Sequence, residues 1–472
     1  MNVSTSFDVI VVGAGPGGIF TTLEIVRKNP DKKVLLMERG KPIEQRMCPA
    51  PSKEKCMHCP ICNIMCGLAG GGAFSDGKVH YYPEELLDIP IGGNLHKYIG
   101  VDPTKKYAAA AHEYYIEFGA TKEIEGMKNP AAISQIKNRI ESVPGLTMPI
   151  VPVRHIGTEC SRDVFKRIQD YLVNSPNVTL MFGTEMEKLI IKDNTVKGVV
   201  TTKGQEFFGE SVVLAVGRSG STEFVHLANK YGIDTAPGTI DIGVRVEIPR
   251  EVLIRECKDL YELKIIAKTP TYKDECRTFC MNDGGFVTSE MTNGIVCANG
   301  HANKNAKSET TNFAILVSIN FNDIQEPMDY MESIGRTINI LGHGNVLVQR
   351  LGDIRKGKRT WKSELETNSV KPTLKAVEAG DITLGFPARI IKDIVEMLDM
   401  MDPVLPGIAD DSILLYGPEL KFYGIRPKYR HAERLETNIK NLFAIGDGCG
   451  LTRGLIQASA SGVVVGRHLA KH

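Results

Sequence analysis

The feature that most constrains this chain is a strand, glycine turn, helix and strand unit between Asp8 and Glu38. An apolar run from Asp8 leads into the triplet Gly13-x-Gly15-x-x-Gly18, and a second apolar run ends in Glu38. In a dinucleotide fingerprint the first glycine permits a tight turn, the second lets a pyrophosphate approach the backbone, and the third lets the helix pack on the strand. An acid about 20 residues further on binds a ribose hydroxyl. This unit predicts an α/β fold of the Rossmann-like type that binds an ADP-containing cofactor.

Two later segments indicate which cofactor is bound. A short apolar run reaches a glycine turn at Asp447, and a helix is predicted over 454–469. In flavoproteins resembling glutathione reductase, the aspartate of such a turn holds the flavin ribityl chain, and the next helix points its positive N-terminus at the flavin. Small residues from Ala458 to Gly462 are expected to let this helix approach a large ligand. A strand and turn ending at Gly217 resemble the segment that precedes the flavin in the same fold, so we predict FAD.

Length and charge fit this prediction and narrow the partners. The 472 residues are enough for two domains, since domains of about 100 to 200 residues are usual. A formal net charge of +1 gives no general field that would attract nucleic acid or an anionic membrane. No segment approaches the roughly 20 apolar residues that a membrane span requires. We expect a cytoplasmic protein with no membrane partner, for which nucleic acid is not an expected partner.

Five of the eleven cysteines lie in one early stretch. Cys56, Cys59, Cys62 and Cys66 have the spacing C-x2-C-x2-C-x3-C of bacterial ferredoxins, although a glycine replaces the usual proline. Three interpretations stay open. The four thiolates bind a [4Fe-4S] iron-sulfur cluster, or they take part in a zinc site or a dithiol relay, or they are thiols without metal. Paired C-x2-C knuckles with a long spacer, typical of zinc, are missing.

A glycine-rich segment over 67–78 follows these cysteines directly. Its glycines exclude an ordinary helix or strand interior, and Phe74, Asp76 and Lys78 distinguish it from a flexible linker. In flavoproteins of this type, the segment after the second strand returns to the isoalloxazine ring. We therefore expect the glycines to lie against the ring and the thiols to lie next to the flavin.

The motifs in combination resemble a family of uncharacterised bacterial and archaeal FAD-dependent dehydrogenases. Besides the fingerprint and the cysteine and glycine segments, the resemblance rests on the motifs at 240–247, 277–281 and 349–353, and it spans nearly the whole chain. It implies a glutathione-reductase-type FAD-binding domain with an inserted α+β substrate domain, and no agreed substrate. Asn282-Asp283 departs from the Cys-Pro pair that many relatives have there.

The anchors divide the chain into four segments. Residues 1–100 form the first part of the FAD-binding domain and contain the cysteine-rich loop. Residues 101–240 contain a helical connection and the second part of this domain, and residues 431–472 form its C-terminal part. Residues 241–430 form the inserted substrate or cap domain. Alternating patterns predict further elements. These are helices over 107–118 and 162–173 and strands over 178–182, 186–191, 196–201, 243–248 and 313–321, with a turn at Asp193-Asn194.

The same motifs predict the contacts to the cofactor. The backbone at Met186 is predicted to contact the adenine. The predicted FAD-binding residues are Gly13, Gly15, Pro16, Gly17, Gly18, Glu38, Arg39, Gly71, Gly72, Ala73, Lys78, Met186, Gly217, Gly446, Asp447, Gly454 and Leu455.

The predicted insert carries the candidate catalytic residues. Cys280 and His301 lie in segments expected to form a sheet edge over the flavin, where either could donate a proton alongside hydride transfer. For each of them an ordinary core or loop role is the alternative. Arg245 pairs either with an acidic substrate group or with a local carboxylate such as Glu247. The basic loop over 353–362 is a solvated loop, a lid for an anionic substrate or a docking site for an acidic electron carrier.

The sequence contains one strand-embedded glycine fingerprint and no second one for a nicotinamide cofactor. Electrons are expected from a nicotinamide that docks directly over the flavin or from a ferredoxin-like donor. We predict a FAD-dependent oxidoreductase that transfers a hydride or two electrons between the flavin and a small-molecule substrate, with the cysteine loop as a candidate electron entry. Two other classes stay open: an electron-transfer flavoprotein without small-molecule turnover, and a flavin-dependent protein that binds or acts on RNA.

Overall fold

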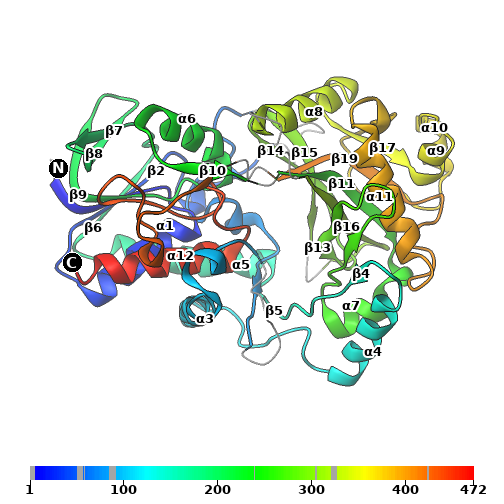
Figure 1. Cartoon of the computed structure of the whole chain (residues 1–472), viewed down its shortest axis with the longest axis horizontal. Coiled ribbons are helices and arrows are strands. Elements are labelled where there is room, and N and C mark those ends of the chain that lie inside the picture. Colours follow the sequence, from blue (N-terminus) through cyan, green and yellow to red (C-terminus); the bar gives the residue numbers. More distant parts are fainter. Residues whose placement is uncertain are drawn as a thin grey trace.

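The computed structural model describes most of the chain and shows two lobes, each built around its own β-sheet (Figure 1). The first lobe contains the glycine fingerprint, and the second is formed mainly by the middle of the sequence. The described residues are 6–49, 57, 59–83, 92–238, 240–302, 306–319, 327–421 and 425–472.

The sheet of the first lobe is mainly parallel. Strands lie in the order β6-β2-β1-β9, all parallel, β21 pairs with β9 in the same direction, and β8 and β7 extend the sheet antiparallel. Parallel strands are buried on both faces, which explains why β1 and β2 read as continuous apolar runs. The strands are β1 (Ser6–Val12), β2 (Val34–Glu38), β6 (Val178–Phe182), β7 (Met186–Lys192), β8 (Thr195–Thr201), β9 (Glu206–Leu214) and β21 (Leu442–Ala444).

Two helices that are far apart in the sequence cross this sheet side by side. Helix α1 (Pro16–Lys28) follows the fingerprint, and α12 (Leu455–Leu469) packs against it (Figure 1). A Cβ atom added at Gly462 would lie 2.2 Å from the Gly17 carbonyl oxygen, so only glycine permits this contact. The prediction that the small residues of α12 serve a ligand is therefore wrong for Gly462, which lies against α1.

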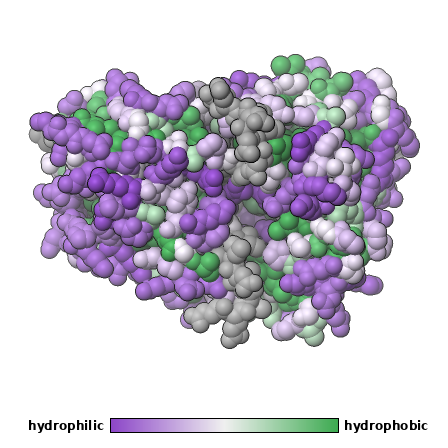
Figure 2. All heavy atoms as spheres, viewed as in Figure 1, coloured by the Kyte–Doolittle hydropathy of each residue, from purple (hydrophilic) through white to green (hydrophobic). Residues whose placement is uncertain are grey.

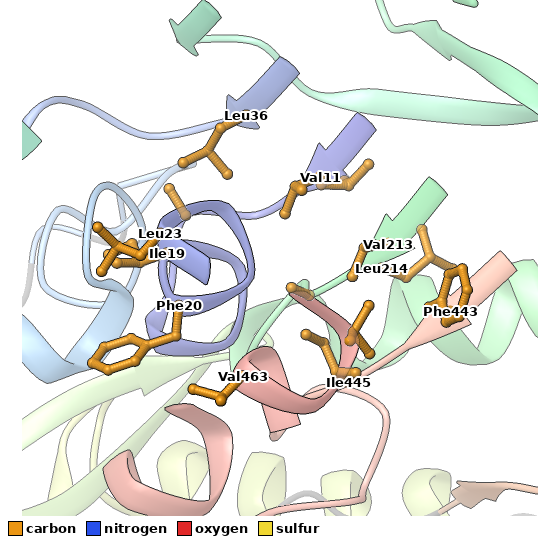
Figure 3. Close-up of a cluster of buried hydrophobic side chains, with 14 of the residues drawn as sticks. Val11, Ile19, Phe20, Leu23, Leu36, Val213, Leu214, Phe443, Ile445 and Val463 are labelled. Atoms are coloured by element: carbon orange, nitrogen blue, oxygen red, sulfur yellow. The ribbon is translucent and has the colours of Figure 1, made fainter. Parts of the chain in front are cut away.

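The core of the first lobe lies between the sheet and these two helices. Figure 3 shows Val11, Leu36 and Val213 from three strands in one buried cluster with Ile19 and Val463 from the two helices. All five side chains are at most 3% exposed. Burial of each large aliphatic side chain stabilises the fold by about 1.5–3 kcal/mol, so this layer holds the glycine turn on a rigid support.

The second lobe is an eight-stranded sheet with helices packed on it. The strand order is β18-β17-β19-β11-β16-β13-β12-β4, and all pairs are antiparallel except β17 with β18. Helix α11 (Ala388–Met401) packs on β11, β12, β13 and β16, and its apolar face fills the core. The strands are β4 (Leu146–Thr147), β11 (Ile240–Pro249), β12 (Ile266–Lys268), β13 (Glu275–Asn282), β16 (Thr310–Ile319), β17 (Val346–Arg350), β18 (Val377–Ala379) and β19 (Leu414–Lys421).

Smaller elements complete the lobes and connect them. The hairpin of β14 (Phe286–Thr292) and β15 (Ile295–His301) packs on the second sheet, and α8 (Pro327–Leu341) covers β15 and β19. The pairs β3 (Lys78–His80) with β5 (Val153–His155) and β10 (Thr235–Pro237) with β20 (Ile425–Pro427) join segments that connect the two lobes. The remaining larger helices are α3 (Val101–Glu117), α4 (Pro130–Glu141), α5 (Thr158–Val173), α6 (Ser221–Tyr231) and α7 (Ile254–Leu260).

The structure confirms the predicted secondary structure closely. The strand predicted over 178–182 is β6, and most other predicted strands and helices match observed elements within four residues. The helix predicted over 107–118 is α3, which begins six residues earlier than predicted. The strand predicted over 313–321 is β16, and its last two predicted residues lie outside the described residues. Asp193 and Asn194 both have positive φ, as the predicted turn between β7 and β8 requires. The mixed α/β fold with a parallel sheet is thus confirmed. Helix α4 and strand β4, from the predicted 101–240 segment, pack with the core of the second sheet.

The surface agrees with the balanced charge of the sequence. Hydrophilic residues dominate the face shown in Figure 2, and hydrophobic residues form small separate groups on both lobes. No helix among the described residues has the length and apolar character that crossing a membrane requires.

Candidate functional site

One cavity of about 880 Å³ extends from the glycine fingerprint in the first lobe to the sheet of the second lobe. Gly15 and Glu38 line one part of it, and Cys280 and His301 line another. Of the predicted FAD-binding residues, fifteen line this cavity, and Gly18 and Ala73 do not. The fifteen are Gly13, Gly15, Pro16, Gly17, Glu38, Arg39, Gly71, Gly72, Lys78, Met186, Gly217, Gly446, Asp447, Gly454 and Leu455.

The glycines of the fingerprint divide into packing and ligand positions. A Cβ at Gly18 would lie 2.0 Å from the Gly13 carbonyl oxygen, and one at Gly13 would lie 2.4 Å from the Ala215 carbonyl oxygen, so both are needed for packing. A Cβ at Gly15 would meet no protein atom within 4 Å. The same is true of Gly217, Gly446 and Gly454, which also line the cavity. Four backbone segments therefore leave space for a ligand at their glycines, which fits a large dinucleotide.

Glu38, the residue predicted to contact the ribose, has a carboxylate that accepts hydrogen bonds from backbone amides. Its Oε2 accepts a hydrogen bond from the Ala14 amide at 2.9 Å, and its Oε1 accepts from the amides of Gly40 and Gly67 at 2.9 Å each. Because a carboxylate has about four acceptor sites, these three bonds orient Glu38 and leave acceptor capacity for a ligand hydroxyl.

The turn at Asp447 is fixed in a similar way. Asp447 Oδ1 accepts hydrogen bonds from Thr452 Oγ1 at 2.5 Å and from the Gly454 amide at 3.3 Å. This carboxylate lines the cavity beside the N-terminus of α12, where unpaired amides favour negative charge. Asp447 and the start of α12 therefore lie side by side on the cavity wall.

The described cysteines do not fit a metal cluster. Cys56 lies outside the described residues, and among those that are described no group of three potential ligands converges. Cys66 lines the cavity, where its Sγ donates to Ser219 Oγ at 3.5 Å, and Arg39 of the same region donates to the Ser219 carbonyl oxygen. Cys66 thus lines the same cavity as the predicted FAD-binding residues, at the end that contains Glu38.

The other end of the cavity is highly charged. Lys78 Nζ lies 3.0 Å from Asp76 Oδ2 and 3.5 Å from Glu262 Oε2, and Lys264 Nζ lies 3.7 Å from Glu262 Oε1. Burial alone would raise the pKa of Glu262, but the two lysines outweigh it and lower this pKa to about 2. Burial, with Lys264, lowers the pKa of His80 to about 4, so its imidazole is neutral at pH 7.

The depressed pKa of Glu262 predicts a loss of stability in acid. Its carboxylate stabilises the folded state above the ordinary pKa near 4.5, and this contribution is lost as the pH falls toward 2. The expected loss between pH 5 and pH 2 is up to about 3 kcal/mol. Urea unfolding at several pH values should show a clearly smaller acid slope for Glu262→Gln than for the wild type. The matched substitution Glu309→Gln, at an exposed site, should leave the slope unchanged; equal slopes for all three proteins would contradict the prediction.

Cys280 and His301 both reach the cavity, as the sequence predicted. Cys280 has a φ of 44°, a left-handed conformation that is uncommon for residues other than glycine, at an irregularity in the pairing of β13 with β16. Burial, together with Glu262, raises the pKa of its thiol, so the thiol keeps its proton at neutral pH.

Arg245 pairs with a local carboxylate. Its Nη2 donates to Glu419 Oε1 at 2.8 Å, and both side chains are 0% exposed. The open question of its partner is thus settled in favour of Glu419, a residue that the sequence reasoning did not consider. The basic loop is also tied down: Arg350 and Lys358 pair with Asp353, and Trp361 is exposed outside the cavity.

Sequence reasoning missed a group of residues at the charged end. Lys264, Lys421 and Phe279 line the cavity, and both ammonium groups lie within 5.6 Å of the Phe279 ring centroid. No motif marks these residues. Only the strand register brings them together, so a sequence signal would have required knowledge of the sheet order.

Comparison with known proteins supports the cofactor. Residues 239–421 match the family described as FAD-dependent protein, C-terminal domain-like, and residues 152–240 match glucose inhibited division protein A. The first match runs almost from the start of β11 to the end of β19, and the second covers much of the first sheet.

Among individual proteins, the chain is similar to an uncharacterised protein of Clostridium beijerinckii, at 23% identity over 98% of this chain and 80% of that one. A short stretch, 10% of this chain and 7% of the relative, is 50% identical to the tRNA uridine 5-carboxymethylaminomethyl modification enzyme MnmG of Alkaliphilus oremlandii. One similar solved structure is E. coli quinol fumarate reductase FrdA, at a TM-score of 0.45 and 12% identity, with 99% of this chain and 70% of that chain covered. Another is L-proline dehydrogenase from P. horikoshii, at a TM-score of 0.43 and 11% identity, with 99% of this chain and 94% of that chain covered.

The glycine-lined cavity and the family matches together define the class: this chain is a flavoprotein that binds FAD. Over residues 239–421 the chain is similar to proteins described as FAD-dependent, and over 152–240 it is similar to glucose inhibited division protein A.

Proposed function

We propose that the protein is a FAD-dependent reductase or dehydrogenase that transfers a hydride between the flavin and a small molecule bound at the second-lobe end of the cavity. The observation that supports this is the continuity of one cavity from Gly15 to Cys280 and His301. FAD, when bound, supplies the two-electron chemistry. In this proposal the FAD lies as in glutathione-reductase-type proteins, and residues 240–421 act as an inserted substrate domain.

The residues of the second lobe position and protonate the substrate. Cys280 retains its proton at neutral pH and faces the cavity, so it suits a general acid for substrate reduction. Lys78 holds the surroundings in place, since its ammonium donates to the Met281 carbonyl oxygen next to Cys280 and pairs with Asp76 and Glu262. His301 is the second candidate for the same proton.

The position of Cys66 bears on the route of electron entry. Because this thiol lies beside Arg39 and Ser219, at the Glu38 end of the cavity, a path from it would reach the nucleotide half of the cofactor first. Direct docking of a nicotinamide over the flavin, or contact with a ferredoxin-like donor, is therefore the route we propose.

A test uses the FAD-loaded protein. The flavin is reduced anaerobically with dithionite, and its reoxidation is followed by stopped-flow absorbance with a panel of unsaturated carbonyl compounds and imines, and with a ferredoxin. Reoxidation by a small molecule supports the proposal. Purified protein without FAD, or reoxidation by the ferredoxin alone, would overturn it, and the second result would favour an electron-transfer flavoprotein.

The proton donor is tested by substitution. Cys280→Ala is expected to slow reoxidation by the small-molecule oxidant about 100-fold, because general acid catalysis typically contributes a factor of about 10² to 10⁴. FAD content should stay at the wild-type level. Cys276→Ala, on the same strand but buried in the core away from the cavity, is the matched control and should react at the wild-type rate. An unchanged rate for Cys280→Ala and a slow rate for His301→Ala would assign the proton to His301 instead.

A further inference from the structure

The end of the cavity in the second lobe contains three buried lysines. The side chains of Lys78, Lys264 and Lys421 are 6%, 5% and 4% exposed, and all three line the cavity. Lysine is seldom buried to this degree unless its charge is compensated. If the carboxylates of the protein do not balance the positive charges of these lysines, a negatively charged ligand is expected to do so.

Strand register explains why two of these lysines meet at one phenylalanine. Ile266, the first residue of β12, pairs with Arg277 of β13. Extending this antiparallel register by two residues, into the segment just before β12, places Lys264 opposite Phe279. Lys421 ends β19, on the other side of β11 and β16 in the sheet order. The Lys264 and Lys421 ammonium groups lie 5.3 Å and 5.6 Å from the Phe279 ring centroid.

The carboxylates around this group are shared. Glu262 forms ion pairs with both Lys78 and Lys264. Glu419 forms ion pairs with Arg245, at 2.8 Å, and with Lys421, at 3.0 Å. Arg245 is 0% exposed and lies closest to Glu419, so this carboxylate is already committed to a buried partner. Among the described residues the ion pairs of this network join four cations and three carboxylates, namely Lys78, Lys264, Lys421 and Arg245 with Asp76, Glu262 and Glu419. Glu290 also lines the cavity, and Arg218, Lys421 and Arg245 lower its pKa. Because Glu290 pairs with Arg218 at 3.2 Å, this additional pair leaves the excess of one positive charge unchanged.

The excess of one positive charge lies in a cavity from which water would be displaced by a ligand. A neutral ligand would bury this charge without compensation, at a cost that rises as the local dielectric constant falls. A ligand with one negative charge would neutralise it and would form charge-assisted hydrogen bonds to ammonium groups.

We propose that Lys264 and Lys421 form a carboxylate-binding subsite across Phe279, and that the substrate is a small organic acid whose apolar part packs on the Phe279 ring. This rests on the proposed function, since it assigns the substrate class of the same cavity. A carboxylate fits better than a phosphate, because a single negative charge balances the network whereas a phosphate dianion would overshoot it. Cys280 is the next residue after Phe279, so an acid bound there places its body beside the candidate proton donor.

Benzoate is a suitable probe because it combines one carboxylate with an apolar ring, and benzamide is its neutral counterpart. Binding of each to the FAD-loaded protein is measured by isothermal titration calorimetry and by the change in the flavin absorption spectrum. We expect benzoate to bind at least 10-fold more tightly than benzamide. Lys264→Gln and Lys421→Gln should each weaken benzoate binding about 10-fold or more and leave benzamide binding unchanged.

Lys268→Gln is the matched control, since this exposed lysine lies four residues after Lys264, at the end of β12, and does not line the cavity. It should bind benzoate as the wild type does. FAD content and circular dichroism of each variant verify that the fold is intact. Phe279→Leu should weaken benzoate more than acetate, because acetate lacks the ring that contacts it.

Three results would overturn the subsite: equal affinity for benzoate and benzamide, benzoate affinity that is unchanged in both lysine variants, or tighter binding of inorganic phosphate than of benzoate. The calorimetric signal does not depend on the flavin. Protein that binds benzoate through the lysines but contains no FAD would support the subsite and overturn the proposed function, so the two failures are distinguishable.

Discussion

Replacing Gly15 by alanine is expected to abolish FAD retention and to leave the thermal midpoint of the apoprotein unchanged. The backbone at Gly15 has a φ of −75° and a ψ of −178°, which alanine adopts without strain, and the new Cβ would meet no protein atom within 4 Å. The methyl group would instead occupy the part of the cavity where the pyrophosphate approaches the backbone. We expect the dissociation constant for FAD to rise at least about 100-fold, as measured by flavin fluorescence on reconstitution.

The matched substitution Gly18→Ala is expected to lower the stability of the apoprotein, which Gly15→Ala leaves unchanged. Its Cβ would lie 2.0 Å from the Gly13 carbonyl oxygen, so the helix would have to move away from the strand. Overpacking of this kind typically costs about 1–3 kcal/mol, and the apoprotein should melt at a lower temperature. A Gly15→Ala protein that keeps stoichiometric FAD, or that melts as early as Gly18→Ala, would show that the two glycines do not have these separate roles.

Replacing Glu419 by glutamine is expected to destabilise the second lobe by about 3 kcal/mol or more. The substitution leaves the Arg245 guanidinium, 0% exposed, and the Lys421 ammonium without their shared countercharge. Removing one partner of a buried ion pair costs about 3–5 kcal/mol because the remaining charge is uncompensated. Urea unfolding followed by circular dichroism measures this loss as a lower midpoint.

The control for this prediction is an exposed pair of the same type. Glu117 lies 2.6 Å from Arg27, and the two side chains are 53% and 24% exposed. Surface ion pairs contribute about 0–1 kcal/mol, so Glu117→Gln should unfold close to the wild-type midpoint. Equal effects of the two substitutions would mean that burial does not distinguish the pairs.

The predicted nucleotide-binding part of the first lobe could be predicted from the sequence, because the residues that specify its structure lie close together in the chain. Gly13, Gly15 and Gly18 lie within six residues of one another, and each acts through backbone geometry that the residue type itself dictates. Glu38 ends one strand and Asp447 follows another, and the apolar runs of both strands are easily recognised. The predicted strand β6 and the turn at Asp193-Asn194 are of the same kind, since periodicity and turn residues specify them directly.

The second lobe was less predictable because its contacts depend on strand order. Arg245 and Glu419 are separated by 174 positions and meet only because β11 pairs with β19. Lys264 lies just before β12 and Lys421 ends β19, and β11, β13 and β16 separate these two strands in the sheet. Periodicity predicts strands but does not predict which strands become neighbours. The cysteines illustrate a different limit, because spacing suggests a ligand set but does not determine where each Sγ points, and Cys66 points into the cavity.

The contact between α1 and α12 has a consequence for when FAD is expected to bind during synthesis of the protein. The cradle for FAD needs the turn after β1, the turn after β21 and the start of α12, which are more than 430 residues apart in the chain. While the ribosome is still translating the second lobe, the early glycine turn lacks one wall. We therefore expect FAD to bind late, after Gly462 has packed on Gly17, and we expect nascent chains that stall earlier to lack the flavin.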